Sequence, residues 1–183
     1  MQQYFYLLPF AVFDAKLLQK LAIQLEKSFN FPVKILSQLE LAKTNYNSVR
    51  RQFDANKILA ETRQVDFSDL KKIVGLCDVD LFASDLNFIF GVAEAPGRAA
   101  VVSTFRLRPE FSSPVKNEQI SNGVLFYTRL LKEVIHELGH AFGLSHCPDK
   151  KCVMYYSNVI QDTDLKNTTF CEKCGKIYKA KNF

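Results

Sequence analysis

The sequence lacks the features that mark several common classes of protein. No apolar run approaches the roughly 20 residues that a transmembrane helix requires, so we expect no membrane partner. The N-terminus has no basic region ahead of an apolar segment, and Gln2 and Gln3 are polar, so no signal peptide is expected. The chain also contains no internal repeat and no low-complexity tract.

Basic residues are in small excess and are not clustered over most of the chain. There are 24 Lys and Arg against 19 Asp and Glu, and the one basic group near the end consists of Lys176, Lys179 and Lys181. A nucleic-acid-binding protein usually shows a basic stripe or patch. We therefore interpret these lysines as a solvated tail and expect no nucleic-acid partner.

Strand and helix patterns alternate along the first 142 residues and indicate a layered α/β arrangement. Apolar residues at helical spacing predict a helix from Asp14 to about Phe29, a second from Asp54, and a long one from about 120 to 142. Strands are expected at residues 3–8, 31–35, 72–76, 87–93 and 99–107, and the third of these has an optional continuation towards Phe82. A turn is expected at Pro96–Gly97, and loops are expected at 40–53 and 108–119.

Two isolated features have ordinary interpretations. Asp78 and Asp80 alternate with apolar residues, and we favour polar positions at a strand end over a cation site. Cys77 lies in an apolar run and is expected to be an inert buried thiol.

All three histidines of the chain lie in one stretch, residues 134–147. His136 and His140 are four residues apart, so on a helix they differ by about 40° and 6 Å and present two imidazoles to one ion. Glu137 is displaced by about 100° from His136, so it flanks the ion instead of binding it. This is the position expected of a general base acting on zinc-bound water.

His146 can reach the same ion only if the helix ends and the chain turns back. A continued helix would place it about 15 Å beyond His136 and on another face. Gly143 follows His140 by three residues, where a positive φ is needed to end the helix. Three neutral histidines leave one zinc position open, as a catalytic site requires. The whole pattern matches the metzincin signature.

Four of the five cysteines follow at metal-binding spacings. Cys147 and Cys152 enclose four residues, Cys171 and Cys174 enclose two, and 18 residues separate the pairs. This arrangement predicts a closed, structural four-cysteine zinc site. With no export signal, free thiols in a cytoplasmic protein are favoured over disulfides.

The motif from His136 to Cys147, followed by Cys152-x-Met154 and Cys171-x-x-Cys174, resembles the archaemetzincin family of metalloproteases. The gap between Met154 and Cys171 is 16 residues, about one fewer than the pattern of this family leads us to expect. The resemblance implies that Met154 is the Met-turn residue beneath the catalytic zinc. It also implies that the strand near 100–105 is the edge strand that binds extended peptide. Tyr156 has the offset of a tyrosine that lies near the zinc in some metzincins, but packing is the favoured role.

The sequence therefore predicts an α+β protein in which helices flank a small mixed twisted β-sheet. We expect one metzincin-like catalytic domain over residues 1–183, with an N-terminal subdomain to about 143 that ends in the long active-site helix. A small zinc-stapled C-terminal subdomain would occupy about 144–183. The chain would bind two Zn²⁺, one catalytic and one structural, and is expected to be a monomer.

The leading functional hypothesis is a zinc-dependent metallopeptidase that hydrolyses peptide bonds of peptide or protein substrates with Glu137 as general base. The alternative is a zinc-stabilised binding or regulatory module with little proteolysis, and a nucleic-acid-binding zinc ribbon ranks third. Endopeptidase and aminopeptidase activities both stay open. An aminopeptidase needs an acid near the substrate amine, and Glu94 and Asp85 are suggested by chain position alone.

Overall fold

A five-stranded mixed sheet forms the centre of the protein, whose computed structural model describes residues 2–84, 86–111 and 121–182. The strand order is β2-β1-β5-β8-β7. The first four strands run parallel, and β7 pairs antiparallel with β8 at one edge. The predicted mixed sheet is confirmed. The strands are β1 (Tyr4–Pro9), β2 (Val33–Ile35), β5 (Leu70–Cys77), β7 (Gly91–Ala93) and β8 (Ala99–Ser103).

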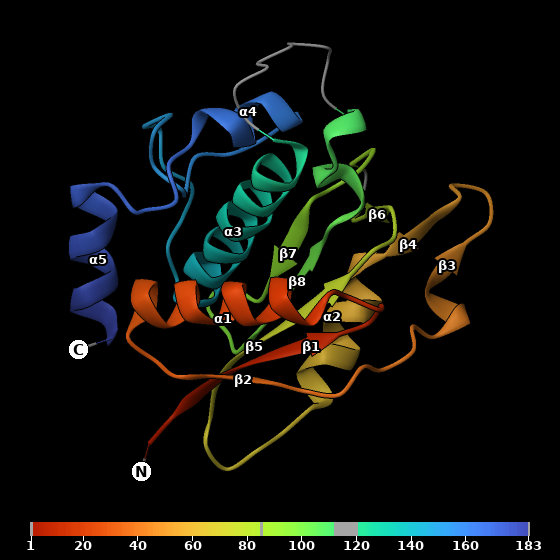
Figure 1. Ribbon diagram of the computed structural model, residues 1–183, viewed down its shortest axis with the longest axis horizontal. Helices are drawn as coiled ribbons and strands as arrows, with labels where there is room; N and C mark the ends of the chain where they lie inside the picture. Colours follow the sequence, from red (N-terminus) through yellow and green to blue (C-terminus); the bar gives the residue numbers. More distant parts are fainter. Residues whose placement is uncertain (1, 85, 112–120, 183) are drawn as a thin grey trace.

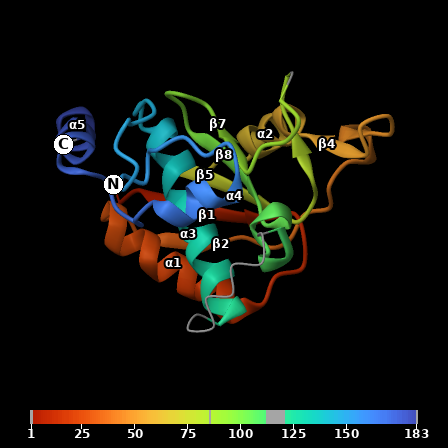
Figure 2. The same ribbon diagram turned by 90° about the horizontal axis from the view of Figure 1, so that it is seen from above.

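Helices cover both faces of this sheet (Figure 1, Figure 2). Because successive side chains of a strand point to opposite faces, Phe5 and Leu7 of β1 join one core cluster while Tyr6 and Leu8 join the other. The first cluster includes α1 (Ala15–Phe29) and α3 (Asn122–Ala141), and the second includes α2 (Ala55–Gln64). The long helix α3 is therefore held along its length against the sheet.

The helix starts agree with the capping residues in the sequence. Asp14 accepts a hydrogen bond from Leu17 N at 2.9 Å, and Asp54 accepts one from Asn56 N at 3.0 Å. Ser121 caps α3, and residue 120, where this helix was expected to begin, lies outside the described residues.

The polar segment 40–53, predicted to be a loop, instead contributes to a second, three-stranded sheet of order β3-β4-β6. The predicted strand at 72–76 ends at Cys77 and does not continue to Phe82, because residues 81–82 form β6 of this small sheet. Its strands are too short to show an apolar alternation in the sequence. The segment contains η1 (Lys43–Asn45) and β3 (Tyr46–Asn47) and leads into β4 (Gln52–Asp54), which pairs with β6 (Leu81–Phe82).

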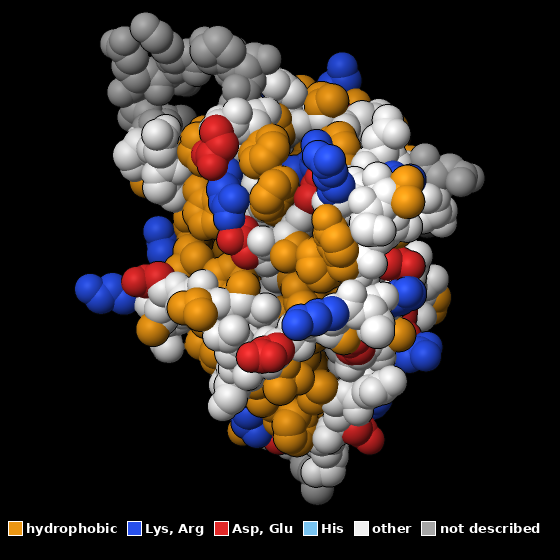
Figure 3. Space-filling model, turned by 90° about the vertical axis from the view of Figure 1, so that its right-hand side faces the viewer, with side chains coloured by type: hydrophobic (Ala, Val, Ile, Leu, Met, Phe, Trp, Pro, Cys, Tyr) orange, Lys and Arg blue, Asp and Glu red, His pale blue; other side chains and the backbone are white. Residues whose placement is uncertain are grey.

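Ion pairs join the segment between β5 and β6 to the chain that follows β8. Asp80 binds Arg106 through both carboxylate oxygens, at 2.5 and 2.7 Å, and Asp78 pairs with Arg108. The two acids are thus paired with arginines, as expected of polar strand-end residues. On the face shown in Figure 3, acidic and basic side chains are interspersed among hydrophobic ones.

The hairpin predicted at 87–107 is present, but its second strand is shorter than expected and lies inside the sheet. β8 ends at Ser103, and η2 (Phe105–Leu107) and η3 (Pro109–Phe111) follow, while residues 112–119 of the predicted loop lie outside the described residues. The expected edge strand at 100–105 is therefore wrong: β8 lies between β5 and β7, and β7 is the edge.

The chain after α3 crosses the end of the helix and forms α4 (Ile160–Leu165) and α5 (Glu172–Asn182). Tyr178 of α5 packs edge-on against Phe29 and Phe142, with ring centroids 5.6 and 5.1 Å away. The division into two subdomains near residue 143 stays a prediction. Among the described helices, none is both long and apolar enough to cross a bilayer.

Candidate active site and metal centres

The three histidines converge at the C-terminal end of α3. His140 Nε2 lies 3.1 Å from His136 Nε2 and 3.2 Å from His146 Nε2. Three nitrogen ligands of a tetrahedral zinc, each about 2.0–2.1 Å from the metal, would be about 3.3 Å apart. The donor set and its spacing therefore fit a zinc ion, and the imidazoles leave room for further ligands on the solvent side.

Gly143 produces the turn that brings His146 back to the other two. Its φ is +81°, a value that L-residues with a side chain rarely adopt. Gly143 N donates to His140 O (2.7 Å) and Leu144 N donates to Gly139 O (3.0 Å), which is the Schellman arrangement of a helix end. The reversal expected from the sequence is present at the residue proposed for it.

Backbone carbonyls orient two of the imidazoles. His136 Nδ1 lies 2.8 Å from Val153 O, and His140 Nδ1 lies 2.8 Å from Leu144 O. A carbonyl can only accept, so each Nδ1 carries the proton and each Nε2 keeps its lone pair for a metal. Burial lowers the pKa of all three histidines, well below the ordinary value for His136, which favours the neutral form that binds metals.

Glu137 lies beside the histidines, buried against the edge strand. A Cβ added to Gly91 of β7 would lie 2.7 Å from Glu137 Cγ and 2.9 Å from its Oε1, so only glycine allows β7 to approach so closely. Burial raises the pKa of Glu137 well above its ordinary value; the nearby Glu133 adds to this, and Lys166 opposes it. No local sequence pattern indicates that Gly91 contacts Glu137.

Met154 packs beneath the turn of α3 that carries the histidines. Its side chain is fully buried, and a Cβ added to Gly139 would lie 2.4 Å from Met154 Sδ. Met154 O accepts a hydrogen bond from Cys147 N at 2.9 Å. The Met-turn role that the resemblance implies for Met154 stays a prediction.

The four C-terminal cysteines form a second group of candidate ligands. Their sulfur atoms all lie within 4.8 Å of one another, and Cys147 Sγ and Cys171 Sγ are 3.8 Å apart. A tetrahedral zinc with Zn–S bonds of about 2.3 Å has edges of about 3.8 Å between sulfurs. Every cysteine described, including the buried Cys77, is a free thiol. The group fits a structural zinc site.

The histidines and Glu137 line a cleft of about 450 Å³. One wall is the segment 86–93, the floor is α3, and the other wall is residues 156–158. The small sheet supports the first wall, because Arg50 donates to Leu86 O (2.6 Å) and Gln52 donates to Asn87 O (2.8 Å). Tyr156 lies at the site, since its ring contacts His146 edge-on at 4.8 Å.

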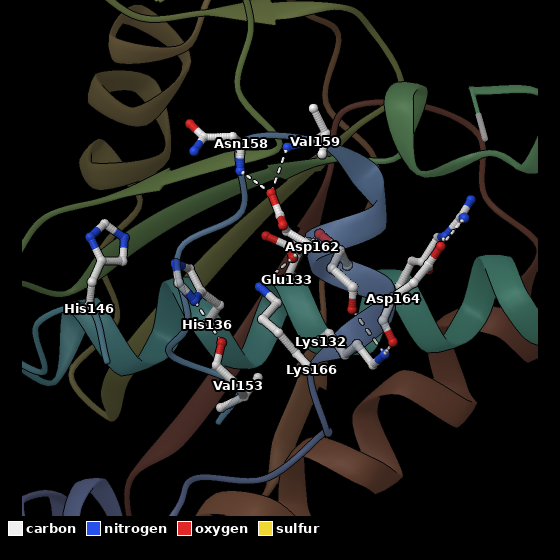
Figure 4. A network of polar contacts seen from close by, with 12 residues as sticks. Lys132, Glu133, His136, His146, Val153, Asn158, Val159, Asp162, Asp164 and Lys166 are labelled. Atoms are coloured by element: carbon white, nitrogen blue, oxygen red, sulfur yellow. Dashed lines mark hydrogen bonds and ion pairs between the residues drawn. The ribbon is translucent and has the colours of Figure 1, made fainter. Parts of the chain in front are cut away.

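A buried ionic network holds α4 against α3 next to this cleft (Figure 4). Lys166 Nζ donates to Glu133 Oε1 at 2.8 Å, and the two side chains are 0% and 3% exposed. Arg129 binds Asp164 with two hydrogen bonds of 2.7 and 2.6 Å. No sequence pattern marks these residues, because lysine and glutamate are rarely fully buried and their partners are distant along the chain.

Of the two acids suggested for an aminopeptidase, Glu94 caps a turn and Asp85 lies outside the described residues. Glu94 Oε2 accepts hydrogen bonds from Arg98 N (3.1 Å) and Ala99 N (3.3 Å), and Glu94 Oε1 pairs with Arg63. Glu94 is not among the residues that line the cleft.

Known proteins share both the sequence and the fold of this chain. The model of peptidase family M54 matches residues 10–180. The archaemetzincin of Methanocaldococcus jannaschii is 42% identical over 142 residues, which are 78% of this chain and 74% of that protein.

Solved structures agree with this match. The crystal structure of archaemetzincin from Methanopyrus kandleri has a TM-score of 0.82 and 32% identity, covering 98% of this chain and 95% of that one. The structure of a zinc-dependent peptidase from Methanocorpusculum labreanum has a TM-score of 0.80 and 26% identity, covering 95% and 99%.

Proposed function

Because the chain belongs to peptidase family M54 and is a metallopeptidase, we propose that it hydrolyses peptide bonds at the three-histidine site with Glu137 as general base. His136, His140 and His146 would hold the catalytic zinc. When bound, this ion would polarise the scissile carbonyl and make a water molecule acidic enough to react near neutral pH.

The position of Glu137 beside the three histidines is the observation that supports this proposal most directly. Its carboxylate lies in the same cleft as the histidines, next to the exposed edge of the sheet. It would take a proton from the attacking water and donate it to the leaving amine.

Strand β7 would bind the substrate. It is the outer strand of the five-stranded sheet, and its residues line the cleft above Glu137. An extended peptide can pair with such an edge through its main chain, which would place a peptide bond beside the histidines.

We propose that the four cysteines Cys147, Cys152, Cys171 and Cys174 hold a second, structural zinc, giving two per chain. The sulfur spacing supports this assignment. The free thiols also support a cytoplasmic location, where cysteines stay reduced.

The test compares the wild type with Glu137→Gln on a broad peptide library, with zinc measured in both. Removal of the base should lower kcat at least about 100-fold, because general-base catalysis contributes on that order. The zinc content should stay at two per chain, since Glu137 is not a ligand. Wild-type turnover by Glu137→Gln would refute the assigned role. A wild type that binds two zinc ions but cleaves no peptide would favour the binding-module alternative.

A further inference from the structure

A second carboxylate lies in the floor of the cleft, one helical turn before Glu137. Glu133 lines the cleft together with the histidines, and its side chain is 3% exposed. Glu133 Oε1 accepts hydrogen bonds from Thr163 Oγ1 at 2.9 Å and Lys166 Nζ at 2.8 Å. The charge of this carboxylate is therefore balanced by a buried ammonium group on the side away from the cleft.

Attachment of α4 does not require this ion pair. Arg129 already binds Asp164 with two hydrogen bonds, and Lys132 Nζ donates to Thr163 O (3.0 Å) and Asp164 O (3.1 Å). A buried ion pair generally adds little stability over apolar side chains of the same size. Apolar residues at positions 133 and 166 together would serve packing equally well, so the buried carboxylate calls for another role.

The opposite wall of the cleft holds a polar atom with no partner. Among the described residues, Ser157 Oγ is the buried side-chain atom that makes no hydrogen bond. Ser157 lines the same cleft, and its loop is fixed because Asn158 N and Val159 N donate to Asp162 Oδ2 at 3.0 and 3.1 Å (Figure 4). A buried hydroxyl without a partner is costly, so a ligand that bonds to it is favoured.

We propose that Glu133 and Ser157 form a polar subsite that selects a carboxamide side chain, Asn or Gln, in a substrate residue next to the scissile bond. This inference rests on the proposed peptidase function. A carboxamide donates through its NH₂ group to the Glu133 carboxylate and accepts through its oxygen from the Ser157 hydroxyl. A lysine or arginine would bury a charge beside a pair that is already neutral, which costs free energy.

The test measures kcat/KM for peptides that differ at one residue, at each position flanking the cleaved bond. Asn is compared with Leu and Gln with Met, because each pair has nearly the same shape, and Lys is included. The wild type should prefer the carboxamide by about tenfold or more at one position, since pockets built to hydrogen-bond a substrate group discriminate strongly against analogues that lack it.

Two variants separate the subsite from stability. Ser157→Ala should lower the ratio of kcat/KM for the Asn peptide over that for the Leu peptide severalfold. The double variant Glu133→Leu, Lys166→Met replaces the ion pair by apolar side chains and should reverse the preference in favour of Leu and Met. If the double variant fails to fold, Ser157→Ala alone decides. Ser68→Ala is the matched control, because Ser68 is exposed and lines a different hollow beside Tyr6 and Lys34.

The outcomes distinguish the two levels of the argument. Peptide cleavage with no carboxamide preference, a preference for Lys, or an unchanged preference in Ser157→Ala would overturn the subsite and leave the peptidase function standing. A wild type that cleaves no peptide of any kind would overturn both.

Discussion

Substitution of Gly143 tests whether the backbone turn after α3 decides the affinity of the histidine site. The residue has φ of +81°, and an added Cβ would lie 3.2 Å from Lys181 Nζ and 3.5 Å from Pro96 Cβ. A single Cβ thus needs only a small shift of a flexible lysine. The cost of a side chain at this position therefore comes from the backbone angle.

The magnitude follows from that angle. A non-glycine residue held in the left-handed region costs about 1–3 kcal/mol, and more for a β-branched residue. If Gly143→Val relaxes by opening the turn, His146 moves away and the Leu144 carbonyl no longer orients His140. A cost of 1–3 kcal/mol corresponds to zinc binding weakened by about 5- to 150-fold at the histidines. The four cysteines lie beyond the turn and should lose little affinity.

The assay is metal content at equilibrium with buffers of defined free zinc, together with peptide cleavage and thermal unfolding. Gly143→Asn is the matched control, because asparagine tolerates positive φ better than other residues with a side chain. The expected order of retained zinc is Gly, Asn, Ala, Val. The reasoning would be refuted if Asn were as damaging as Val, or if Gly143→Val removed zinc from both groups equally.

Three further predictions concern packing, thiol reactivity and pH. Gly139→Ala should lower the free energy of unfolding in urea by about 1–3 kcal/mol, because the added Cβ would clash with Met154 Sδ. Gly123→Ala in the same helix is the control: its Cβ would meet no atom within 4 Å, so this variant should be neutral or stabilising. Burial raises the pKa of Cys77 to about 12, so this thiol should react with a thiol reagent only after the protein is unfolded. At pH 8 the reagent should label no cysteine in the zinc-loaded protein, four cysteines after the zinc is chelated, and Cys77 only in denaturant. Labelling of all five cysteines before denaturant is added would contradict this. Burial, with a smaller effect of Lys71, lowers the pKa of Lys72 from 10.5 to about 8. Between pH 8 and 10.5 the unfolded chain therefore binds more protons at Lys72 than the folded protein does, so the free energy of unfolding should rise with pH across that range. Lys72→Met should remove that rise in the urea midpoint, and an unchanged slope would refute the attribution.

Local signals predicted much of this molecule. Asp14 and Asp54 marked helix starts, and Gly143 marked the helix end, because capping and positive φ depend on residues close in sequence. The spacing of the histidines and cysteines was sufficient to predict two groups of ligands that the structure brings together.

Contacts between distant segments could not be predicted in the same way. The pair Glu133–Lys166 joins residues 33 positions apart, and Arg50 reaches Leu86 across 36. Neither has a periodic or motif signature. The strand at the sheet edge was misplaced for a related reason: β7 has three residues, and its position outside β8 depends on pairing partners and not on its own composition.

The segment Cys152–Met154 contributes to both candidate metal sites within three residues. Cys152 belongs to the sulfur group, the Val153 carbonyl orients His136, and the Met154 carbonyl holds Cys147. An ion bound by the four sulfurs would order this segment and thereby pay part of the entropy of arranging His136. Thermodynamic reciprocity then requires that zinc at the histidines tighten binding at the sulfurs by the same factor. We therefore expect the two ions to bind with positive cooperativity through this segment, so that zinc at either site raises the affinity of the other.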